Sequence, residues 1–148
     1  MIWKPHVTVA AVIEADGRFL LVEECIAGKQ VYNQPAGHLE PGESLTDAVV
    51  RETLEETAWH FRPEALIGLY RWHHPETDST YLRVTFSGRC LFHESGRQLD
   101  ADIARSVWLS ASEIRAQAGN LRSPLVLKSI DDYLAGAAYP LALLADVE

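Results

Sequence analysis

Residues 37–59 read GHLEPGESLTDAVVRETLEETAW, and this stretch decides how the rest of the chain is interpreted. Two glycines and a proline among its first six residues predict a loop. Ser44-Leu-Thr-Asp47 then resembles a capping box with Asp in place of Glu, so a helix is expected from there to about Thr57. The segment holds six carboxylates and one arginine, which account for −5 of the chain's net charge of −8. The acidity of the protein is therefore concentrated in one short segment.

Three carboxylates share one side of the predicted helix. At about 100° per residue, Glu52, Glu55 and Glu56 fall within an arc of about 100°. Val50 and Leu54 fall on the opposite side and are expected to pack against a sheet. Oxygen ligands without sulfur or imidazole favour Mg²⁺ or Mn²⁺ over zinc, and Mg²⁺ in turn favours phosphate chemistry. The alternative is an acidic helix face that meets only solvent.

The charged residues and one glycine form the pattern Gly-x5-Glu-x7-Arg-Glu-x2-Glu-Glu. In a chain of ordinary composition, these six residues would occur at this spacing by chance with a frequency on the order of 10⁻⁸ to 10⁻⁷ per starting position. The pattern resembles the Nudix box, the signature of hydrolases that act on nucleoside diphosphates linked to another moiety. The six positions are Gly37, Glu43, Arg51, Glu52, Glu55 and Glu56.

The resemblance extends beyond the box. Residues 33–40, 120–126 and 139–141 are similar to one bacterial phosphatase branch of the same superfamily, so that the likeness covers roughly residues 2–145. It implies an α/β fold, a Nudix-type α/β/α sandwich with a mixed β-sheet. It also implies a single Nudix hydrolase domain over residues 1–148, with the box at 37–59.

The chain departs from the box pattern at three positions. Thr53 stands where the box prefers an aliphatic residue, and Trp59 where it prefers Ile, Leu or Val. Ala58 replaces the usual glycine after the helix. If this position needs a left-handed backbone, alanine costs about 1 kcal/mol there. None of the three changes removes a predicted ligand or base.

Patterns outside the box predict the remaining elements. A buried strand at 6–14 and an apolar run at 19–22 are divided by the hairpin signal Asp16-Gly17, while the loop-rich residues 28–43 allow only short strands. Ser110 to Glu113 is a capping box, and Ser123-Pro124 is a second helix start, with an end expected near Gly136. Further strands are expected near 64–73, 80–92 and 106–109.

Length and composition exclude several classes of protein. The 148 residues suit one domain, and 47% hydrophobic residues exclude a disordered chain. The sequence contains no apolar run of about 18 residues and no secretory signal, which argues against a membrane protein and favours a cytoplasmic location. The net charge argues against nucleic-acid binding. Nothing marks a dimer surface, so a monomer is expected, and Cys25 and Cys90 are expected to be small buried apolar groups.

The resemblance implies roles for the box residues. Glu52, Glu55 and Glu56 would be the metal ligands, together with the main-chain carbonyl of Ala36. Arg51 would hydrogen-bond Glu43 and, with Gly37, hold the loop against the helix. The implied reaction is attack of water on phosphorus, with a carboxylate taking the proton.

The identity of that carboxylate stays open at this level. Some Nudix enzymes use a box glutamate, here Glu55 or Glu56, and others use an acid from a distant loop. Asp102 stands where such an acid often lies, and Asp100 is the second choice; a surface turn is the alternative interpretation of both.

Residues elsewhere in the chain are candidates for substrate binding. Arg122 precedes a predicted helix, and a guanidinium suits phosphate oxygens, although the segment is also explained as a helix start. Three aromatic residues could stack on a base or pyrimidine ring, although strand aromatics usually belong to the core. His73 and His74 are expected to face solvent near a turn, and His38 is left unassigned. The three aromatic residues are Tyr32, Trp72 and Tyr81.

The expected function follows from the resemblance. It implies a Mg²⁺-dependent phosphatase that releases inorganic phosphate from a small-molecule phosphoanhydride. The implied substrates are nucleoside tri- and diphosphates and hydroxymethylpyrimidine pyrophosphate or thiamine pyrophosphate. One alternative is a Nudix pyrophosphohydrolase of another specificity, such as ADP-ribose or a dinucleoside polyphosphate. The other is a catalytically silent nucleotide- or metal-binding module.

Overall fold

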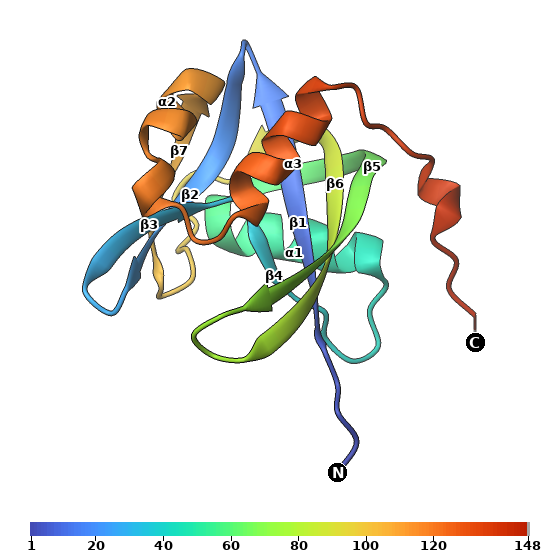
Figure 1. Cartoon of the computed structure of the whole chain (residues 1–148). Helices are drawn as coiled ribbons and strands as arrows, with labels where there is room; N and C mark the ends of the chain where they lie inside the picture. Colours follow the sequence, from blue (N-terminus) through green and yellow to red (C-terminus); the bar gives the residue numbers. More distant parts are fainter. Residues whose placement is uncertain (148) are drawn as a thin grey trace.

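The computed structural model describes residues 1–147, which form seven strands, three α-helices and two short 3-10 helices (Figure 1). The helices are α1 (Leu45–Thr57), α2 (Ala111–Ala116) and α3 (Leu125–Leu134). The strands are β1 (His6–Ala15), β2 (Arg18–Ile26), β3 (Lys29–Asn33), β4 (Ala36–His38), β5 (Trp59–His74), β6 (Ser79–His93) and β7 (Ile103–Ser110).

The strands form one mixed sheet in the order β3-β2-β1-β6-β5, with β4 paired to β1 and β7 paired to β2. β1 and β6 are parallel, whereas the other pairs are antiparallel. The mixed sheet confirms the α/β prediction. β5 and β6 are longer than the runs predicted at 64–73 and 80–92, because β5 starts directly after the turn that ends α1.

Helices cover both faces of the sheet, which confirms the predicted α/β/α sandwich (Figure 1). On one face, Val9, Ala11 and Ile13 of β1 pack in one core cluster with Ala48 and Val49 of α1. On the other face, Val12 packs in a second cluster with residues of α2 and α3. Side chains alternate between the faces of a strand, so a strand covered on both faces needs apolar residues at every position. This requirement explains the unbroken apolar run that marked β1 in the sequence.

The two ends of α1 follow the expectations from sequence. Ser44 Oγ accepts a hydrogen bond of 3.0 Å from the backbone N–H of Asp47, which caps the first turn. Ala58 ends the helix with φ +63°, and its N–H donates to the carbonyl of Leu54 at 2.9 Å. The left-handed backbone expected for the missing glycine is therefore present, and alanine adopts it.

The predicted core face of α1 was wrong. Val50 and Leu54 are only half-buried, whereas Ala48, Val49 and Thr53 are fully enclosed. The sheet-facing side of the helix is the side that carries Glu52 and Glu56, because these carboxylates reach toward β4. The Thr53 hydroxyl fits this apolar position by donating to the carbonyl of Val49 at 2.8 Å.

The two later helices start where the sequence predicts. Ser110 and Glu113 form a reciprocal capping box at α2, with bonds of 2.9 and 3.2 Å. Ser123 Oγ accepts from the N–H of Leu125 at 3.2 Å at the start of α3, and Gly136 follows the end of that helix with φ +93°. Cys25, in contrast, is exposed and not buried as expected.

No helix within residues 1–147 is long and apolar enough to cross a membrane.

Candidate active site

Gly37 in β4 lies directly against the Glu52 carboxylate of α1. A Cβ atom at position 37 would lie 2.1 Å from Glu52 Cδ and 2.2 and 2.4 Å from its two oxygens. Any side chain there would displace the carboxylate. The glycine that opens the box pattern therefore provides the space in which helix and loop meet.

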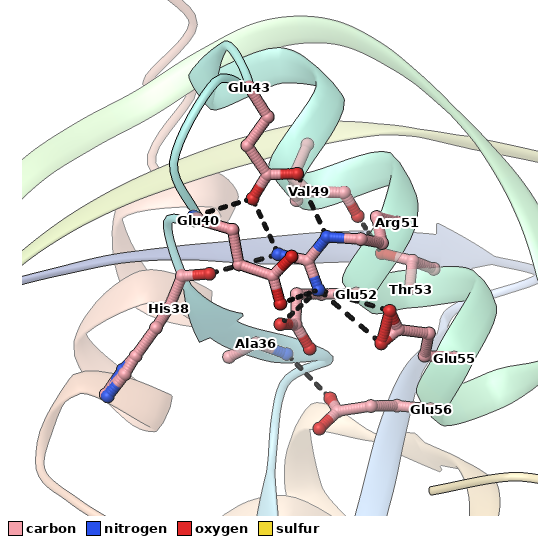
Figure 2. A network of polar contacts seen from close by, with 10 residues as sticks. All are labelled: Ala36, His38, Glu40, Glu43, Val49, Arg51, Glu52, Thr53, Glu55 and Glu56. Carbon is pink, nitrogen blue, oxygen red and sulfur yellow. Dashed lines mark hydrogen bonds and ion pairs between the residues drawn. The ribbon is translucent and has the colours of Figure 1, made fainter.

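Arg51 ties the loop before α1 to the carboxylates of the helix (Figure 2). Its Nε and Nη2 donate to the two oxygens of Glu43 at 2.9 and 2.6 Å, and Nη2 also donates to the carbonyl of His38 at 3.1 Å. Its Nη1 donates to Glu52 Oε1 at 2.8 Å and to Glu55 Oε1 at 3.2 Å. The bidentate bond lowers the pKa of Glu43, and its carboxylate raises the pKa of Arg51. The contact between Arg51 and Glu43 expected from the resemblance is present.

Three carboxylates converge beside this network. Glu52, Glu55 and Asp100 each place one oxygen within 4.8 Å of the others. The loop that carries Asp100 is held to α1 by a backbone bond of 3.1 Å from the Asp100 N–H to the carbonyl of Glu55. Burial raises the pKa of Glu52, and burial together with the charge of Glu55 raises the pKa of Asp100. Crowded carboxylates with raised pKa values are stabilised by a cation.

Glu56 lies apart from this cluster and points toward β4 (Figure 2). Its Oε1 accepts a hydrogen bond of 2.9 Å from the Ala36 N–H, and its side chain is almost completely buried. Burial raises the pKa of Glu56 to about 9, against the effect of the Ala36 bond, and the charges of Glu52 and Glu24 act in the same direction as burial. The ionised form of Glu56 therefore needs a nearby cation, and without one the carboxyl group holds a proton.

Glu56 and Asp100 line a cavity of about 330 Å³. Residues from β1 to β6, from α1, and from the loops before β7 and α3 together with the first residues of these two elements line it. Those that bear on the chemistry are Glu24, Ala36, Gly37, His38, Glu56, Trp72, His74, Tyr81, Arg83, Asp100, Asp102 and Arg122. Acidic, cationic and aromatic groups together line this cavity, and such a mixture suits a ligand with both an anionic and a flat part.

A family model described as NUDIX domain matches residues 4–128. The chain belongs to the Nudix family. Phosphatase NudJ of Escherichia coli strain K12 is 46% identical to it over 144 residues, which are 97% of this chain and 93% of the relative. A protein of the same name from Shigella flexneri matches equally well. Among solved structures, a NUDIX hydrolase from Nitrosomonas europaea superposes with a TM-score of 0.95 at 52% identity, covering 97% of this chain and 98% of that one.

These matches confirm the family and the fold expected from residues 37–59. As a Nudix hydrolase, the protein acts on phosphoanhydride bonds. Glu52, Glu55 and Glu56 of the Nudix box all lie in α1. In the structure an acid from outside the box, Asp100, lies beside Glu52 and Glu55. The sequence placed Asp102 before Asp100 as the distant acid; both line the cavity, but Asp100 lies within the carboxylate cluster.

The aromatic candidates of this Nudix protein separate into two groups. Trp72 and Tyr81 are paired neighbours on β5 and β6, line the cavity, and stack with ring centroids 5.8 Å apart. Tyr32 does not line the cavity; its hydroxyl donates to Glu23 at 3.0 Å. His74 lines the cavity, whereas His73 is exposed as expected.

Two arginines of the Nudix protein line the cavity. Arg122 was predicted, and its Nη1 donates to the buried carboxylate of Glu24 in a short ion pair. Arg83 on β6 was missed by sequence reasoning, although an arginine inside the apolar run of a strand is a signal that could have found it.

Proposed function

We propose that this Nudix hydrolase releases inorganic phosphate from nucleoside tri- and diphosphates and from hydroxymethylpyrimidine pyrophosphate or thiamine pyrophosphate, with Mg²⁺ as its metal. The observation that carries the proposal is the convergence of Glu52, Glu55 and Asp100, the last of which lines the same cavity as Glu56. The likeness to Phosphatase NudJ over 97% of the chain supports the choice of a phosphatase within the family.

The donor set fits a hard divalent cation. Its members are carboxylate oxygens, which suit Mg²⁺ or Mn²⁺, and the space that Gly37 leaves lets the Glu52 carboxylate approach the loop. Glu52, Glu55 and Asp100 would hold the ion, with Glu56 and the Ala36 carbonyl as the further ligands that the family resemblance implies. A bound divalent ion neutralises phosphate oxygens and lowers the pKa of water.

The protein's own groups supply the rest of the chemistry. Glu56 lines the cavity and is the base that we propose for the attacking water; burial raises its pKa to about 9, so a bound cation would be needed to keep the carboxylate ionised near neutral pH. Asp102 and Asp100 line the same cavity and are the alternative bases. Arg51 does not enter this chemistry; it fixes the positions of Glu52 and Glu55.

The aromatic residues Trp72 and Tyr81 of the cavity support a substrate with an aromatic ring. The stacked pair Trp72 and Tyr81 offers a flat surface to a nucleobase or pyrimidine, and Arg122 offers a guanidinium at the same cavity. A cavity of about 330 Å³ suits a small molecule. The chain's net charge of −8 disfavours nucleic acid as a ligand, and we infer that the protein acts as a monomer.

A phosphate-release assay tests the proposal directly. The panel contains nucleoside tri- and diphosphates, hydroxymethylpyrimidine pyrophosphate, thiamine pyrophosphate, ADP-ribose and a dinucleoside polyphosphate, each with Mg²⁺ and with EDTA. Direct release of phosphate from the first four, abolished by EDTA, is the expected result. Glu55→Gln should raise the Mg²⁺ concentration needed for half-maximal activity, with the exposed Glu76→Gln as control.

Other outcomes point to the alternatives. Phosphate that appears only after a phosphatase or pyrophosphatase is added would move the substrate class to ADP-ribose or dinucleoside polyphosphates and overturn the NudJ-like specificity. No turnover under either condition would favour a silent binding module. Sedimentation in the assay buffer decides whether the protein is a monomer.

A further inference from the structure

Arg83 is a buried cation without an anionic partner. Its side chain is 4% exposed, and within residues 1–147 it pairs with no carboxylate. Its Nη2 donates to two neutral amide oxygens, Asn33 Oδ1 at 3.1 Å and Gln34 Oε1 at 3.3 Å. These contacts orient the guanidinium but do not neutralise it. A buried charge of this kind is costly unless an opposite charge joins it.

Arg83 lines the cavity and has side-chain donors without a partner. Nε and Nη1 of Arg83 have no hydrogen-bond partner. Within residues 1–147, the one side-chain polar atom that is both fully enclosed and without a partner is Thr85 Oγ1, so neither Arg83 nitrogen is fully enclosed. The two nitrogens are therefore accessible, and Arg83 lines the cavity. Burial lowers the pKa of Arg83 to about 10, while Glu24 and Glu56 act to raise it, so the guanidinium is charged at neutral pH.

Arg83 differs in this respect from the other cavity arginine. The ion pair with Glu24 already neutralises Arg122, and nearly half of the Arg122 side chain is exposed. Among the residues that the structure describes, Arg83 is therefore the cavity arginine without a direct ion pair, and the charges of Glu24 and Glu56 act on it only from a distance.

Arg83 also has aromatic and acidic neighbours in the cavity. Tyr81, two residues earlier on β6, shares its face of the strand and stacks on Trp72. Thr8 of β1 lies opposite Arg83 and pairs in turn with His38 of β4, the strand that also carries Ala36, whose N–H donates to Glu56. The cavity therefore holds Arg83 together with both the aromatic pair and the Glu56 carboxylate.

We propose that Arg83 binds a phosphate of the substrate that is not transferred, the one between the aromatic ring on Trp72 and Tyr81 and the scissile bond. This inference rests on the proposed function and narrows its substrate class to ring-bearing diphosphates and longer phosphate chains. If the single phosphate of a monophosphate lies at the carboxylate cluster, no phosphate remains for Arg83 to bind. We therefore expect monophosphates to be poor substrates.

Binding without metal tests this role apart from catalysis. Isothermal titration calorimetry in EDTA measures the dissociation constants of ADP and adenosine for wild type, Arg83→Met and Arg83→Lys. Wild type is expected to bind ADP at least about tenfold more tightly than adenosine, because one charge-assisted contact is worth about that factor. Arg83→Met should bind both equally, and Arg83→Lys should fall between them, because lysine is a point charge without the planar fork.

The control variant is Arg89→Met, on the same strand but exposed and paired with Glu64. It should retain the wild-type preference for ADP. If Arg83 merely holds Asn33 and Gln34, its variants will weaken ADP and adenosine alike, which overturns the proposal. The proposal also fails if wild type shows no preference for ADP. If Arg83→Met does not fold, Arg83→Lys decides the matter alone.

Turnover provides a second measurement. With Mg²⁺, Arg83→Met should raise KM for a nucleoside diphosphate about tenfold and Arg83→Lys should raise it less, with a much smaller change of kcat in both, because the contact is present in ground state and transition state alike. An unchanged KM would contradict the assigned role. Wild-type protein without any hydrolysis would refute the proposed function, whereas the titrations in EDTA would still report on Arg83.

Discussion

Gly37 leaves room for the Glu52 carboxylate because it has no side chain. Gly37→Ala should displace the Glu52 carboxylate, because the new Cβ would lie 2.1 Å from Glu52 Cδ. We expect the Mg²⁺ requirement of phosphate release to rise about 10- to 100-fold, the usual effect of disturbing a ligand's support. A Mg²⁺ titration of activity measures this change. Gly119→Ala is the matched control, since its Cβ meets nothing within 4 Å and its φ is not positive; equal titrations for both variants would contradict the argument.

Glu56 allows a test of chemistry without a change of shape. Glu56→Gln should lower kcat by a factor of about 10² to 10⁴, the range for loss of a general base. The protein should stay folded, because the amide oxygen of glutamine can still accept the 2.9 Å bond from the Ala36 N–H. Phosphate release and the Tm from circular dichroism measure the two effects. A variant with wild-type activity would remove Glu56 from the reaction.

The residues found from sequence and those missed differ in their distance along the chain. Glu52, Glu55 and Arg51 lie within one helix turn or two, so helical spacing alone brings them together. Asp100 joins Glu55 only through a backbone bond to α1, and Arg83 enters the cavity from β6. No local pattern reports such contacts. For this reason the sequence favoured Asp102 over Asp100 and overlooked Arg83.

At the scale of elements, two alanines adopt the left-handed backbone that favours glycine. Ala27, in the exposed turn between β2 and β3, has φ +50°, and Ala58, buried at the end of α1, has φ +63°. Ala27→Gly should stabilise the protein by about 1 kcal/mol through relief of this strain. Ala58→Gly should gain less, because it also loses a buried methyl group worth about 0.8 kcal/mol. Urea denaturation measures both effects.

The control for this pair is Ala116→Gly, at the exposed last position of α2. Its backbone is helical, so glycine there should destabilise the protein by about 0.5–1 kcal/mol. A loss of stability in Ala27→Gly as well would show that the turn carries no strain.

Glu23 joins three strands and gives the sheet a defined response to acid. From β2 it accepts from Arg105 Nε of β7 at 3.1 Å and from the Tyr32 hydroxyl of β3 at 3.0 Å. The bond to Arg105 lowers the pKa of Glu23 below 4.5, its value in the unfolded chain. A carboxyl with a lowered pKa adds stability above the unfolded value and loses it as the pH falls through the folded one.

Glu23→Gln should therefore lower the Tm at neutral pH and weaken its fall on acidification below 4.5. Circular dichroism melts across that range measure the difference. Glu64→Gln is the control, because its pair with Arg89 is solvent-exposed and should contribute little. Parallel Tm curves for wild type and Glu23→Gln would show that the three-strand contact adds nothing.

Element boundaries were predictable where side chains near in sequence define them. Ser44, Ser110 and Ser123 mark helix starts through bonds that span two or three residues. The orientation of α1 was not predictable in the same way. Its buried side depends on the position of β4 and on the reach of Glu56 to Ala36, and neither is a property of the helix itself.

At the scale of the whole molecule, the sheet order lies beyond local sequence reasoning. β1 and β6 pair in parallel from His6 with Tyr81 to Ile13 with Gly88, across some seventy residues that contain α1 and β5. Apolar alternation predicts each strand but not its neighbour. The α/β/α sandwich was predicted from the family resemblance and not from the strand patterns, because the Nudix box determines where one loop and one helix meet the sheet.

Folding itself assembles the carboxylate cluster that we propose as the metal site, and this would link metal binding to global stability. The folded chain brings carboxylates of Glu52, Glu55 and Asp100 within 4.8 Å of one another, whereas the unfolded chain disperses them. An ion that binds only the folded state stabilises it by about 2.7 kcal/mol at one hundred times its dissociation constant. For a chain of 148 residues this corresponds to a Tm increase of about 5–10 °C. Melts in EDTA and in MgCl₂ measure it.

The same melts must separate binding from screening. NaCl at the ionic strength of the MgCl₂ sample weakens repulsion between carboxylates but offers them no ligand bonds. Mg²⁺ should therefore raise the Tm well beyond NaCl, and Glu55→Gln should reduce the excess because it removes one of the converging oxygens. If NaCl raises the Tm as far as MgCl₂, the cluster is relieved by screening alone, and the carboxylates do not form a metal site.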